Sequence, residues 1–244
     1  MLTFLIPAYN EEKRIGRCIS VLVSEFPGSK YLIIFDGNDR TPEVVSRFSQ
    51  VKLIKFGKRV GKGRTIIEGI KAVDQNDIVA IVDADLPVDI LDIHKAENAL
   101  VNGDMLIAKR IYSQVPKSRL FLHDSYIALA KLFFSKLRPL PDWQGGFKLV
   151  KASSVSMVSQ ELILNDFIFD TNLVYSFLRH NMNVVVFPIK WIHKEKGSKV
   201  SGQIFKVLLL DLLSLIKMRA YYSPIKNWFS LNPSLQCRRK YRNF

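Results

Sequence analysis

Two carboxylates spaced one residue apart, Asp83 and Asp85, are the residues of this sequence most suited to chemistry. They directly follow the apolar run 78–82, which is typical of a strand buried on both faces of a parallel sheet. Because strand side chains alternate, we expect both carboxylates to point the same way at the strand's carboxyl end. Two such charges repel each other unless a cation lies between them, so we expect Mg²⁺ or Mn²⁺, shared with the phosphates of a substrate. The alternative is a pair of solvated turn aspartates.

A second acid and a basic, glycine-containing loop extend this pattern. Asp36 follows the apolar run 31–35, and the loop 57–64 combines glycines with lysines and arginines. Backbone N–H groups and cations in front of a helix suit the approach of phosphate groups. The residue order of a Walker phosphate-binding loop is absent. An ordinary turn after Asp36 and a solvated basic loop at 57–64 are the alternatives.

The elements that must position these residues alternate between strand and helix. Strands are predicted at 3–6, 31–35, 51–56, 78–82, 105–108 and 183–189. Helices are predicted at 10–23 with Asn10 as N-cap, 42–48, 65–73, 88–100, 119–137, 167–178 and 204–216, and a loop at 139–148. This alternation predicts a parallel, doubly wound sheet, and ligands bind such sheets at the carboxyl ends of the strands.

Composition limits the possible classes of function. The 244 residues carry 36 Lys and Arg against 22 Asp and Glu, a net charge of +14, which favours nucleic acid, a membrane surface or phosphorylated substrates as partners. The 48% hydrophobic content excludes a disordered chain. The two cysteines, Cys18 and Cys237, do not suggest a disulfide framework, and a reducing compartment is expected. The four histidines lie in ordinary surroundings and are predicted to be structural or exposed.

Two segments are predicted to form amphipathic helices at a membrane interface. Residues 119–137 are rich in Leu, Phe, Ile and Ala with a basic fringe, and residues 204–216 are mostly Leu, Ile and Val. No window offers the roughly 20 uninterrupted apolar residues of a spanning helix. A basic tail follows the second segment and suits an anionic leaflet. The alternative for both segments is a core helix.

The short motifs occur in one order along the chain. They are Ile6 to Glu11, Asp36-Gly37, Gly61-Lys62-Gly63, Asp83-Ala84-Asp85, Lys109-Arg110, Asp142 to Phe147 and Gly197-Ser198-Lys199. In this order, over about residues 3–200, the sequence resembles the family 2 glycosyltransferases, and more narrowly the polyprenyl-phosphate sugar synthases that make dolichyl-phosphate mannose and glucose. The resemblance implies an α/β GT-A fold with a mostly parallel sheet flanked by helices, a nucleotide-sugar donor, a divalent metal and a lipid-phosphate acceptor.

The resemblance also implies roles for individual residues. Asp83 and Asp85 would hold the metal and the donor diphosphate, and Arg110 would face the sugar phosphate. These three residues are the predicted catalytic set. Ala84 and Lys62 are predicted to bind substrate. The remaining predicted substrate-binding residues are Pro7, Tyr9 and Glu11 for the nucleotide, Ile34 and Asp36 for the base and ribose, Asp142, Gln144 and Gly146 on the acceptor side, and Lys194 and Lys199 for the phosphates. Candidates for gripping the acceptor phosphate are Lys117, Arg119 and Arg138.

Four positions depart from the family pattern. Phe35 replaces a first acid, Pro87 stands where a third polar metal ligand is common, and Lys194 replaces an arginine and loses its bidentate geometry. The segment Gln144 to Lys148 replaces the common Thr-Ser-Gly-Phe-Arg. These departures bear on the identity of the sugar and the base more than on the class of reaction.

The predicted function is metal-dependent, inverting transfer of a hexose from a GDP-mannose or UDP-glucose type of donor to a polyprenyl or dolichyl phosphate. A phosphate monoester, with a second pKa of about 6, is largely dianionic at neutral pH and needs no general base. We expect residues 1–202 to form the GT-A domain, with an interface helix at about 119–138, and residues 203–244 an amphipathic helix and basic tail. A peripheral or monotopic protein at the cytoplasmic face of an anionic membrane, without a transmembrane helix, is expected.

Two other functions are open. A family 2 transferase acting on a glycan or a lipid-linked oligosaccharide would share the donor site. A non-enzymatic binder of anionic membrane or nucleic acid would explain the charge but not the carboxylate pair at a buried strand end. The basic segments lack the interleaved aromatic residues of single-strand binding surfaces, so nucleic acid is not expected as a partner.

Overall fold

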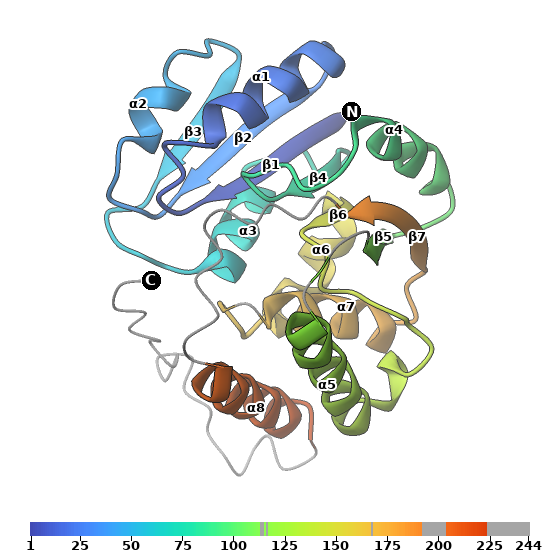
Figure 1. The fold of residues 1–244 in the computed structure, drawn as a ribbon. Helices are drawn as coiled ribbons and strands as arrows, with labels where there is room; N and C mark the ends of the chain where they lie inside the picture. Colours follow the sequence, from blue (N-terminus) through green and yellow to red (C-terminus); the bar gives the residue numbers. More distant parts are fainter. Residues whose placement is uncertain (113–114, 116, 167, 192–203, 224–244) are drawn as a thin grey trace.

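The computed structural model describes residues 1–112, 115, 117–166, 168–191 and 204–223, and it contains one mixed sheet flanked by helices (Figure 1). The strands are β1 Leu2–Ala8, β2 Lys30–Phe35, β3 Val51–Lys55, β4 Ile78–Val82, β5 Met105–Tyr112, β6 Phe147–Lys151 and β7 Val184–Trp191. The α-helices are α1 Ile15–Glu25, α2 Thr41–Val45, α3 Lys62–Lys71, α4 Ile90–Ala99, α5 Lys117–Phe133, α6 Ala152–Val158, α7 Phe169–Arg179 and α8 Ile204–Tyr221. Short 3₁₀ helices cover Ser135–Leu137 and Ser159–Glu161.

The sheet has the strand order β3-β2-β1-β4-β6-β5-β7. Strands β1, β2, β3 and β4 pair in parallel, and β5 pairs in parallel with β7. The apolar runs of β1, β2 and β4 are buried because helices cover both faces of this part of the sheet. The predicted α/β class and mostly parallel sheet are therefore confirmed, and Asp83 and Asp85 follow the carboxyl end of a central strand.

Strand β6 corrects the prediction of a loop up to residue 148. It lies antiparallel between β4 and β5, with Val82 opposite Phe147 and Ile81 opposite Lys148. Its lysines gave it the pattern of an exposed segment, although Lys148 is only 1% exposed. Because the strand runs antiparallel to β4, its first residues lie at the carboxyl end of β4, and the loop in front of it is brought to the acids.

Two apolar cores lie on opposite faces of the sheet. Helices α1, α2 and α4 pack on one face, and α3, α6 and α7 on the other, with α5 and α8 side by side outside α7 (Figure 1). Each helix presents its apolar side chains to the sheet, as Ile15, Ile19 and Leu22 of α1 do. The sequence prediction of α1 was wrong at its start, because Asn10 adopts a left-handed φ of 56° and α1 begins only at Ile15.

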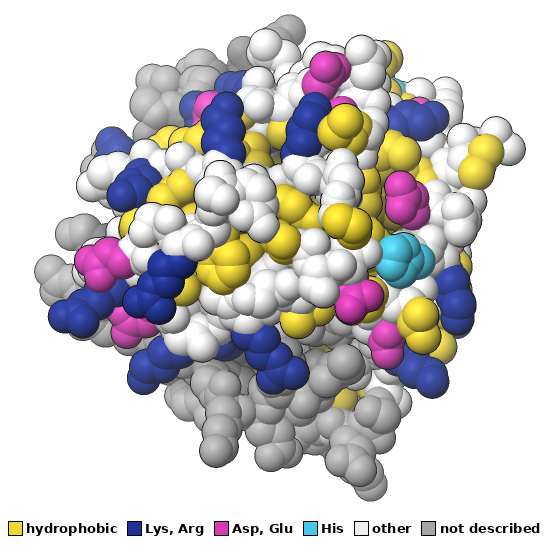
Figure 2. Space-filling model, turned by 90° about the horizontal axis from the view of Figure 1, so that it is seen from above, with side chains coloured by type: hydrophobic (Ala, Val, Ile, Leu, Met, Phe, Trp, Pro, Cys, Tyr) yellow, Lys and Arg dark blue, Asp and Glu magenta, His cyan; other side chains and the backbone are white. Residues whose placement is uncertain are grey.

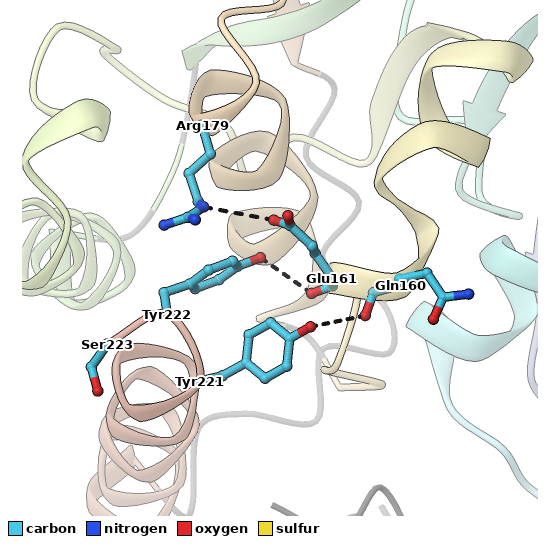
Figure 3. Close-up of a pocket in the computed structure, with 6 residues that line it drawn as sticks. All are labelled: Gln160, Glu161, Arg179, Tyr221, Tyr222 and Ser223. Atoms are coloured by element: carbon cyan, nitrogen blue, oxygen red, sulfur yellow. Dashed lines mark hydrogen bonds and ion pairs between the residues drawn. The ribbon is translucent and has the colours of Figure 1, made fainter. Parts of the chain in front are cut away.

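The carboxyl end of helix α8 is hydrogen-bonded to the 3₁₀ helix Ser159–Glu161. The hydroxyl of Tyr222 donates to the Glu161 carbonyl oxygen at 3.2 Å, and that of Tyr221 donates to the Gln160 carbonyl oxygen at 3.1 Å (Figure 3). Arg179 lies 3.7 Å from the Glu161 carboxylate. These residues and Ser223 line a polar cavity of about 320 Å³. It is walled by the ends of α7 and α8, away from the carboxyl ends of the strands.

The outer surfaces of α5 and α8 keep large apolar side chains exposed: Phe121 and Leu132 on α5, and Leu209, Leu213 and Ile216 on α8. Among the helices that the structure describes, none combines the length and the apolar character needed to cross a bilayer. On the face drawn in Figure 2, Lys and Arg side chains are spread among apolar and acidic ones instead of forming a single patch.

Candidate active site

The Asp83 carboxylate, just beyond β4, pairs with a lysine from the first turn of α3. Its Oδ1 accepts a hydrogen bond from Lys62 Nζ at 2.8 Å, and the two side chains are 34% and 20% exposed. Burial alone would lower the pKa of Lys62, but the carboxylates of Asp83 and Asp170 raise it above its ordinary value. The ammonium group therefore stays charged and supplies one positive charge at the acid pair.

The glycine in front of β6 is packed directly on this acid. A Cβ added to Gly146 would lie 1.8 Å from Asp83 Oδ2, and the Asp83 N–H donates to the Gly146 carbonyl oxygen at 3.2 Å. While the Asp83 carboxylate keeps this position, no side chain larger than hydrogen fits between it and the loop. A Cβ on the preceding Gly145 would lie 3.6 Å from Arg110 Cγ. These two consecutive glycines thus lie close to Asp83 on one side and to Ala108 and Arg110 of β5 on the other.

A buried ion pair lies behind Lys62. The Lys148 ammonium is 2.8 Å from Asp170 Oδ1 and donates to the Gly145 carbonyl oxygen at 2.7 Å. Asp170 Oδ2 is 3.9 Å from Lys62 Nζ. Burial lowers the pKa of Lys148, and the charge of Asp170 opposes that effect. Asp170 lies in the helix predicted at 167–178, and neither residue was predicted to have a role.

Asp36 holds the glycine loop that leads into α3. This buried carboxylate accepts hydrogen bonds from the backbone N–H groups of Val60 at 3.0 Å and Gly61 at 2.8 Å. Gly61 has a φ of +92°, a left-handed conformation that favours glycine, and its Cβ position is blocked by the Asn165 carbonyl oxygen at 2.4 Å. Asp36 therefore fixes the loop that positions Lys62.

The segment after β1 brings a third carboxylate near the acid pair. Burial raises the pKa of Glu11, the Arg14 guanidinium at 2.7 Å opposes the rise, and the charges of Asp85 and Asp83 add to it. Tyr9 is 37% exposed, and the guanidinium of Arg59 lies 4.0 Å from its ring centroid. This side of the site offers an exposed aromatic ring and cations, which suit a nucleotide.

On the other side of the glycines, Arg110 forms a two-pronged pair with Asp142. Arg110 Nε and a terminal nitrogen donate to the two carboxylate oxygens at 2.7 and 3.0 Å. His123 Nε2 of α5 lies 3.2 Å from Asp142 Oδ1, and the Gln144 N–H donates to the same oxygen at 3.0 Å. His123 was predicted to be structural or exposed, and its side chain is 15% exposed and lies beside Asp142. The arrangement keeps two nitrogen-bearing side chains on Asp142.

The carboxylate oxygens of Asp83 and Asp85 are suitable ligands for a divalent metal. Both are carboxylates, both are partly exposed, and their charges act together on Glu11, Arg14 and Lys62. Hard cations such as Mg²⁺ and Mn²⁺ prefer such oxygen ligands and accept others from water and phosphates. No cluster of three or more His, Cys, Asp or Glu side chains suited to a metal occurs in the described part of the chain. Further ligands would therefore come from water and substrate.

Comparison with known families decides the class of this protein. The model of the family described as glycosyl transferase family 2 matches residues 3–158, more than half of the chain. The chain belongs to glycosyl transferase family 2. It is accordingly a glycosyltransferase, as the ordered motifs predicted.

Curated relatives of this glycosyltransferase include a dolichyl-phosphate beta-glucosyltransferase of Trichomonas vaginalis, 26% identical over 88% of this chain and 72% of that protein. A protein of the same name from Saccharomyces cerevisiae is 23% identical over 89% of the chain and 74% of its own length. The Homo sapiens protein of this name is 25% identical over 82% of this chain and 69% of its own length.

A solved structure, glucosyl-3-phosphoglycerate synthase from Mycobacterium tuberculosis in complex with Mn²⁺, uridine diphosphate and phosphoglyceric acid, aligns with a TM-score of 0.69 and 14% identity. The alignment covers 88% of this chain and 78% of that one. At this identity the match concerns the fold alone, and it confirms the predicted GT-A fold of the glycosyltransferase.

The fold brings most of the predicted site residues of this glycosyltransferase to the carboxyl ends of β1, β2, β4 and β5, but not all of them. The side chains of Ile34 and Ala84 are buried in the two cores. Pro7 forms part of β1. The side chains of Lys117 and Arg119, and all of Lys194 and Lys199, lie outside the described residues, and Arg138 is exposed after the 3₁₀ helix Ser135–Leu137.

Three residues of the site, His123, Lys148 and Asp170, were missed because their partners lie 19 to 22 residues away or farther along the chain. One local signal existed for Lys148, which stands between the apolar residues Phe147 and Leu149. A lysine within an apolar strand predicts a buried partner of opposite charge.

Proposed function

We propose that this chain transfers glucose from a nucleoside diphosphate glucose to the phosphate of dolichol or another polyprenol, with inversion at the anomeric carbon. The curated relatives that carry the name dolichyl-phosphate beta-glucosyltransferase support this choice of sugar and acceptor. The geometry supports the class of reaction, because one loop lies near both Asp83, which we propose for the metal and diphosphate, and Arg110, which we propose for a second phosphate.

The observation that carries the proposal is the pair of consecutive glycines between the two parts of the site. Gly146 contacts the Asp83 carboxylate, and Gly145 approaches Arg110. A donor diphosphate held at Asp83 and an anionic acceptor held at Arg110 would therefore meet over a stretch of backbone without side chains. Such close and oriented placement is the main contribution that a protein makes to transfer between two bound substrates.

In this mechanism each charged residue acts on one of the two substrates. Asp83 and Asp85 would hold a divalent cation, which supplies charge neutralisation for the leaving diphosphate when it is bound. Lys62 adds a second positive charge on the same side. The resemblance put Arg110 at the sugar phosphate. We place it instead at the acceptor phosphate, because Asp142, which holds its orientation, is a predicted acceptor-side residue. The acceptor phosphate is already a nucleophile, so no side chain has to remove a proton from it.

A lipid acceptor also requires a surface on which the chain can meet a membrane. The exposed apolar side chains of α5 and α8 support an interface role for these two helices. His123 of α5 contacts Asp142, so the helix that we place at the membrane also reaches the acceptor side of the site. We place the protein at the cytoplasmic face of the membrane, as a peripheral or monotopic protein.

The experiment that tests the proposal offers the purified protein a panel of radiolabelled nucleotide sugars, including UDP-glucose and GDP-mannose. Dolichyl phosphate is supplied in liposomes with Mn²⁺, Mg²⁺ or EDTA. The variant is Asp85→Asn, which removes one charge of the acid pair. The matched control is Asp89→Asn, four residues away, where the exposed side chain caps α4 and Asn caps equally well.

We expect glucose to appear in a lipid-phosphate product, dependent on the metal, lost in Asp85→Asn and retained in Asp89→Asn. Label in a glycan and not in the lipid phosphate would favour the alternative of a glycan acceptor. Label from GDP-mannose alone would keep the class of reaction and overturn the choice of sugar. Failure to bind any nucleotide sugar would overturn the proposal.

A further inference from the structure

Four charged side chains of alternating sign run from the interior to the acid pair. Lys148 contacts Asp170 at 2.8 Å, Asp170 lies 3.9 Å from Lys62, and Lys62 contacts Asp83 at 2.8 Å. The side chains of Lys148 and Asp170 are only 2% and 7% exposed. The proposed reaction uses Asp83 and Lys62 but gives no role to the two buried members.

Stability alone is a weak explanation for the buried pair. Taking two charges out of water is costly, and an apolar pair of similar volume is often as stable or more stable. The pair is also not closed on itself, because the second oxygen of Asp170 faces the Lys62 ammonium. A buried carboxylate that directs one oxygen at a residue of the site suggests a part in the work of that site.

The position of Lys62 indicates the role of Asp170 in the site. Its ammonium lies between two carboxylates and is closer to Asp83, a residue suited to holding a metal. A divalent cation at Asp83 would repel an ammonium group that is 2.8 Å from the same carboxylate. Lys62 must then move, and among the described residues the other carboxylate within ion-pair distance is Asp170.

We propose that Asp170 is a positioning residue that receives the Lys62 ammonium when a divalent cation takes Asp83. A shift of about 1 Å would bring Lys62 from 3.9 Å to the usual distance of a charged hydrogen bond with Asp170. Lys62 would remain in the site, where its charge can act on the donor diphosphate. The inference rests on the proposed function, because it takes from it the metal at Asp83.

Lys148 keeps Asp170 in place for this exchange. Its ammonium binds Asp170 Oδ1 and the Gly145 carbonyl oxygen, so the carboxylate is tied to the loop whose next residue, Gly146, packs on Asp83. The two carboxylates between which Lys62 would move, Asp83 and Asp170, are thereby both fixed to one short segment of chain. Asp170 Oδ2 is left directed at Lys62.

The inference makes a specific prediction for binding of Mn²⁺ alone, measured by the electron paramagnetic resonance signal of free Mn²⁺. In Asp170→Asn, Lys62 loses its second site and competes more strongly for Asp83. We expect the Kd for Mn²⁺ to rise about tenfold, as for other residues that orient metal ligands. In a Lys62→Met background the competitor is gone, so adding Asp170→Asn should change the Kd less than about twofold.

The comparison of the two backgrounds separates positioning from a merely structural role. If Asp170 only maintained the fold, its replacement would raise the Kd by the same factor with and without Lys62, and that result would overturn the inference. Asp170→Asn leaves Lys148 buried without a counter-charge and can fail to fold. Asp170→Asn, with and without Lys62→Met, is therefore also measured in a Lys148→Met background. Thermal unfolding is recorded for each variant.

The proposed function and the inference can fail separately. Wild-type protein that shows the Lys62-dependent pattern of Mn²⁺ binding but does not label lipid phosphate supports the inference and overturns the proposed acceptor. Wild-type protein that labels lipid phosphate while the effect of Asp170→Asn on Mn²⁺ binding is independent of Lys62 overturns the inference alone. Absence of Mn²⁺ binding to the wild type also overturns the inference.

Discussion

Arg110 and Asp142 form a two-pronged ion pair, with contacts of 2.7 and 3.0 Å, although they are 32 residues apart in the chain. Arg110 lies two residues beyond Ala108, where the buried part of β5 ends, and Asp142 lies in the loop that the antiparallel β6 brings back to the same end of the sheet. The arginine side chain is 13% exposed, and it lies 5.4 Å from the Tyr112 ring and 5.6 Å from that of Trp191. Asp142 thus holds a partly shielded guanidinium in a fixed orientation.

Arg110→Lys should specifically impair use of the acceptor. Lysine keeps the charge but loses the two parallel N–H groups that hold Asp142 and that suit a phosphate. Loss of a charged hydrogen bond predicts that kcat/KM for the lipid phosphate falls about 10- to 100-fold. The KM for the nucleotide sugar should change less than about twofold, because the proposed function places Arg110 on the acceptor side of the site. Steady-state kinetics with each substrate varied in turn measures both effects.

The control for Arg110→Lys is Lys109→Arg, the reverse exchange at the exposed neighbouring position. It should leave both kinetic parameters near their wild-type values. If Arg110→Lys lowered kcat/KM only for the nucleotide sugar, this arginine would belong to the donor side instead.

The Asp142 carboxylate predicts how stability depends on pH. Burial alone would raise its pKa, but hydrogen bonds from His123 and Arg110 and the Arg110 charge hold it well below the ordinary value. For a carboxyl group whose pKa is lowered by folding, the stabilisation is present above the unfolded pKa, about 4, and is lost as the pH falls through the folded pKa. Asp142→Asn should therefore lower the free energy of unfolding at pH 7 by roughly 2 kcal/mol.

Urea unfolding of wild type and Asp142→Asn at several pH values tests this sign. The difference in the free energy of unfolding between the two proteins should be constant from pH 7 to pH 5 and should shrink only below about pH 4. A difference that already disappears between pH 7 and pH 5 would show that a different group is responsible.

Gly146→Ala should disable the acid pair with little effect on the fold. The new methyl group would lie 1.8 Å from Asp83 Oδ2, the end of a partly exposed side chain that can move away at low cost. A displacement of about 1 Å at a reacting centre can cost about 100-fold in rate, so we expect a loss of at least that size in kcat/KM. Gly28→Ala is the control, since nothing lies within 4 Å of its Cβ position. A Gly146→Ala protein with wild-type kinetics would mean that Asp83 does not take part.

The part of the site that lies in one stretch of sequence was the part that could be predicted. Asp83 and Asp85 follow an apolar run whose length and composition indicate a buried strand, and the position of a strand end is a local property. Asp36 was found by the same rule. The antiparallel β6 could not be found this way, because its lysines indicate an exposed segment unless the distant Asp170 is known to neutralise Lys148.

The role of His123 shows the same limit. Its spacing in α5 indicates only a residue near the edge of an amphipathic helix, while its contact with Asp142 depends on how α5 packs against the sheet. The start of α1 was misplaced for a related reason. Asn10 has the residue type of an N-cap, but its side chain accepts from the Asn38 N–H and it adopts a left-handed turn instead.

Tyr222 and Tyr221 at the end of α8 offer a matched pair for testing how that helix is attached. The Tyr222 hydroxyl contacts Asn172 Nδ2 at 2.9 Å and Ser176 Oγ at 2.7 Å, besides donating to the Glu161 carbonyl oxygen. The Tyr221 hydroxyl donates one exposed hydrogen bond, to Gln160 (Figure 3). The two residues differ in how far their contacts extend into the chain.

The contacts of Tyr222 continue toward the donor side of the site. Asn172 Oδ1 accepts from the N–H groups of Ile163 and Leu164, and the carbonyl oxygen of the next residue, Asn165, accepts from the Gly63 N–H at 3.2 Å. The segment 163–165 therefore connects α8 to the glycine loop that Asp36 holds and that carries Lys62. Loosening the end of α8 should increase the mobility of that loop.

Tyr222→Phe removes a partly buried hydroxyl and leaves its partners without it, so it should lower the free energy of unfolding by about 1–3 kcal/mol. Tyr221→Phe removes the exposed hydrogen bond to Gln160 and should lower the free energy of unfolding by only about 0.5 kcal/mol. Hydrogen exchange should become faster at residues 60–64 and 161–166 in Tyr222→Phe, and not in Tyr221→Phe, because opening of the segment becomes easier. Equal exchange at residues 60–64 in both variants, with a larger stability loss in Tyr222→Phe, would mean that α8 is attached to the fold without affecting the donor side.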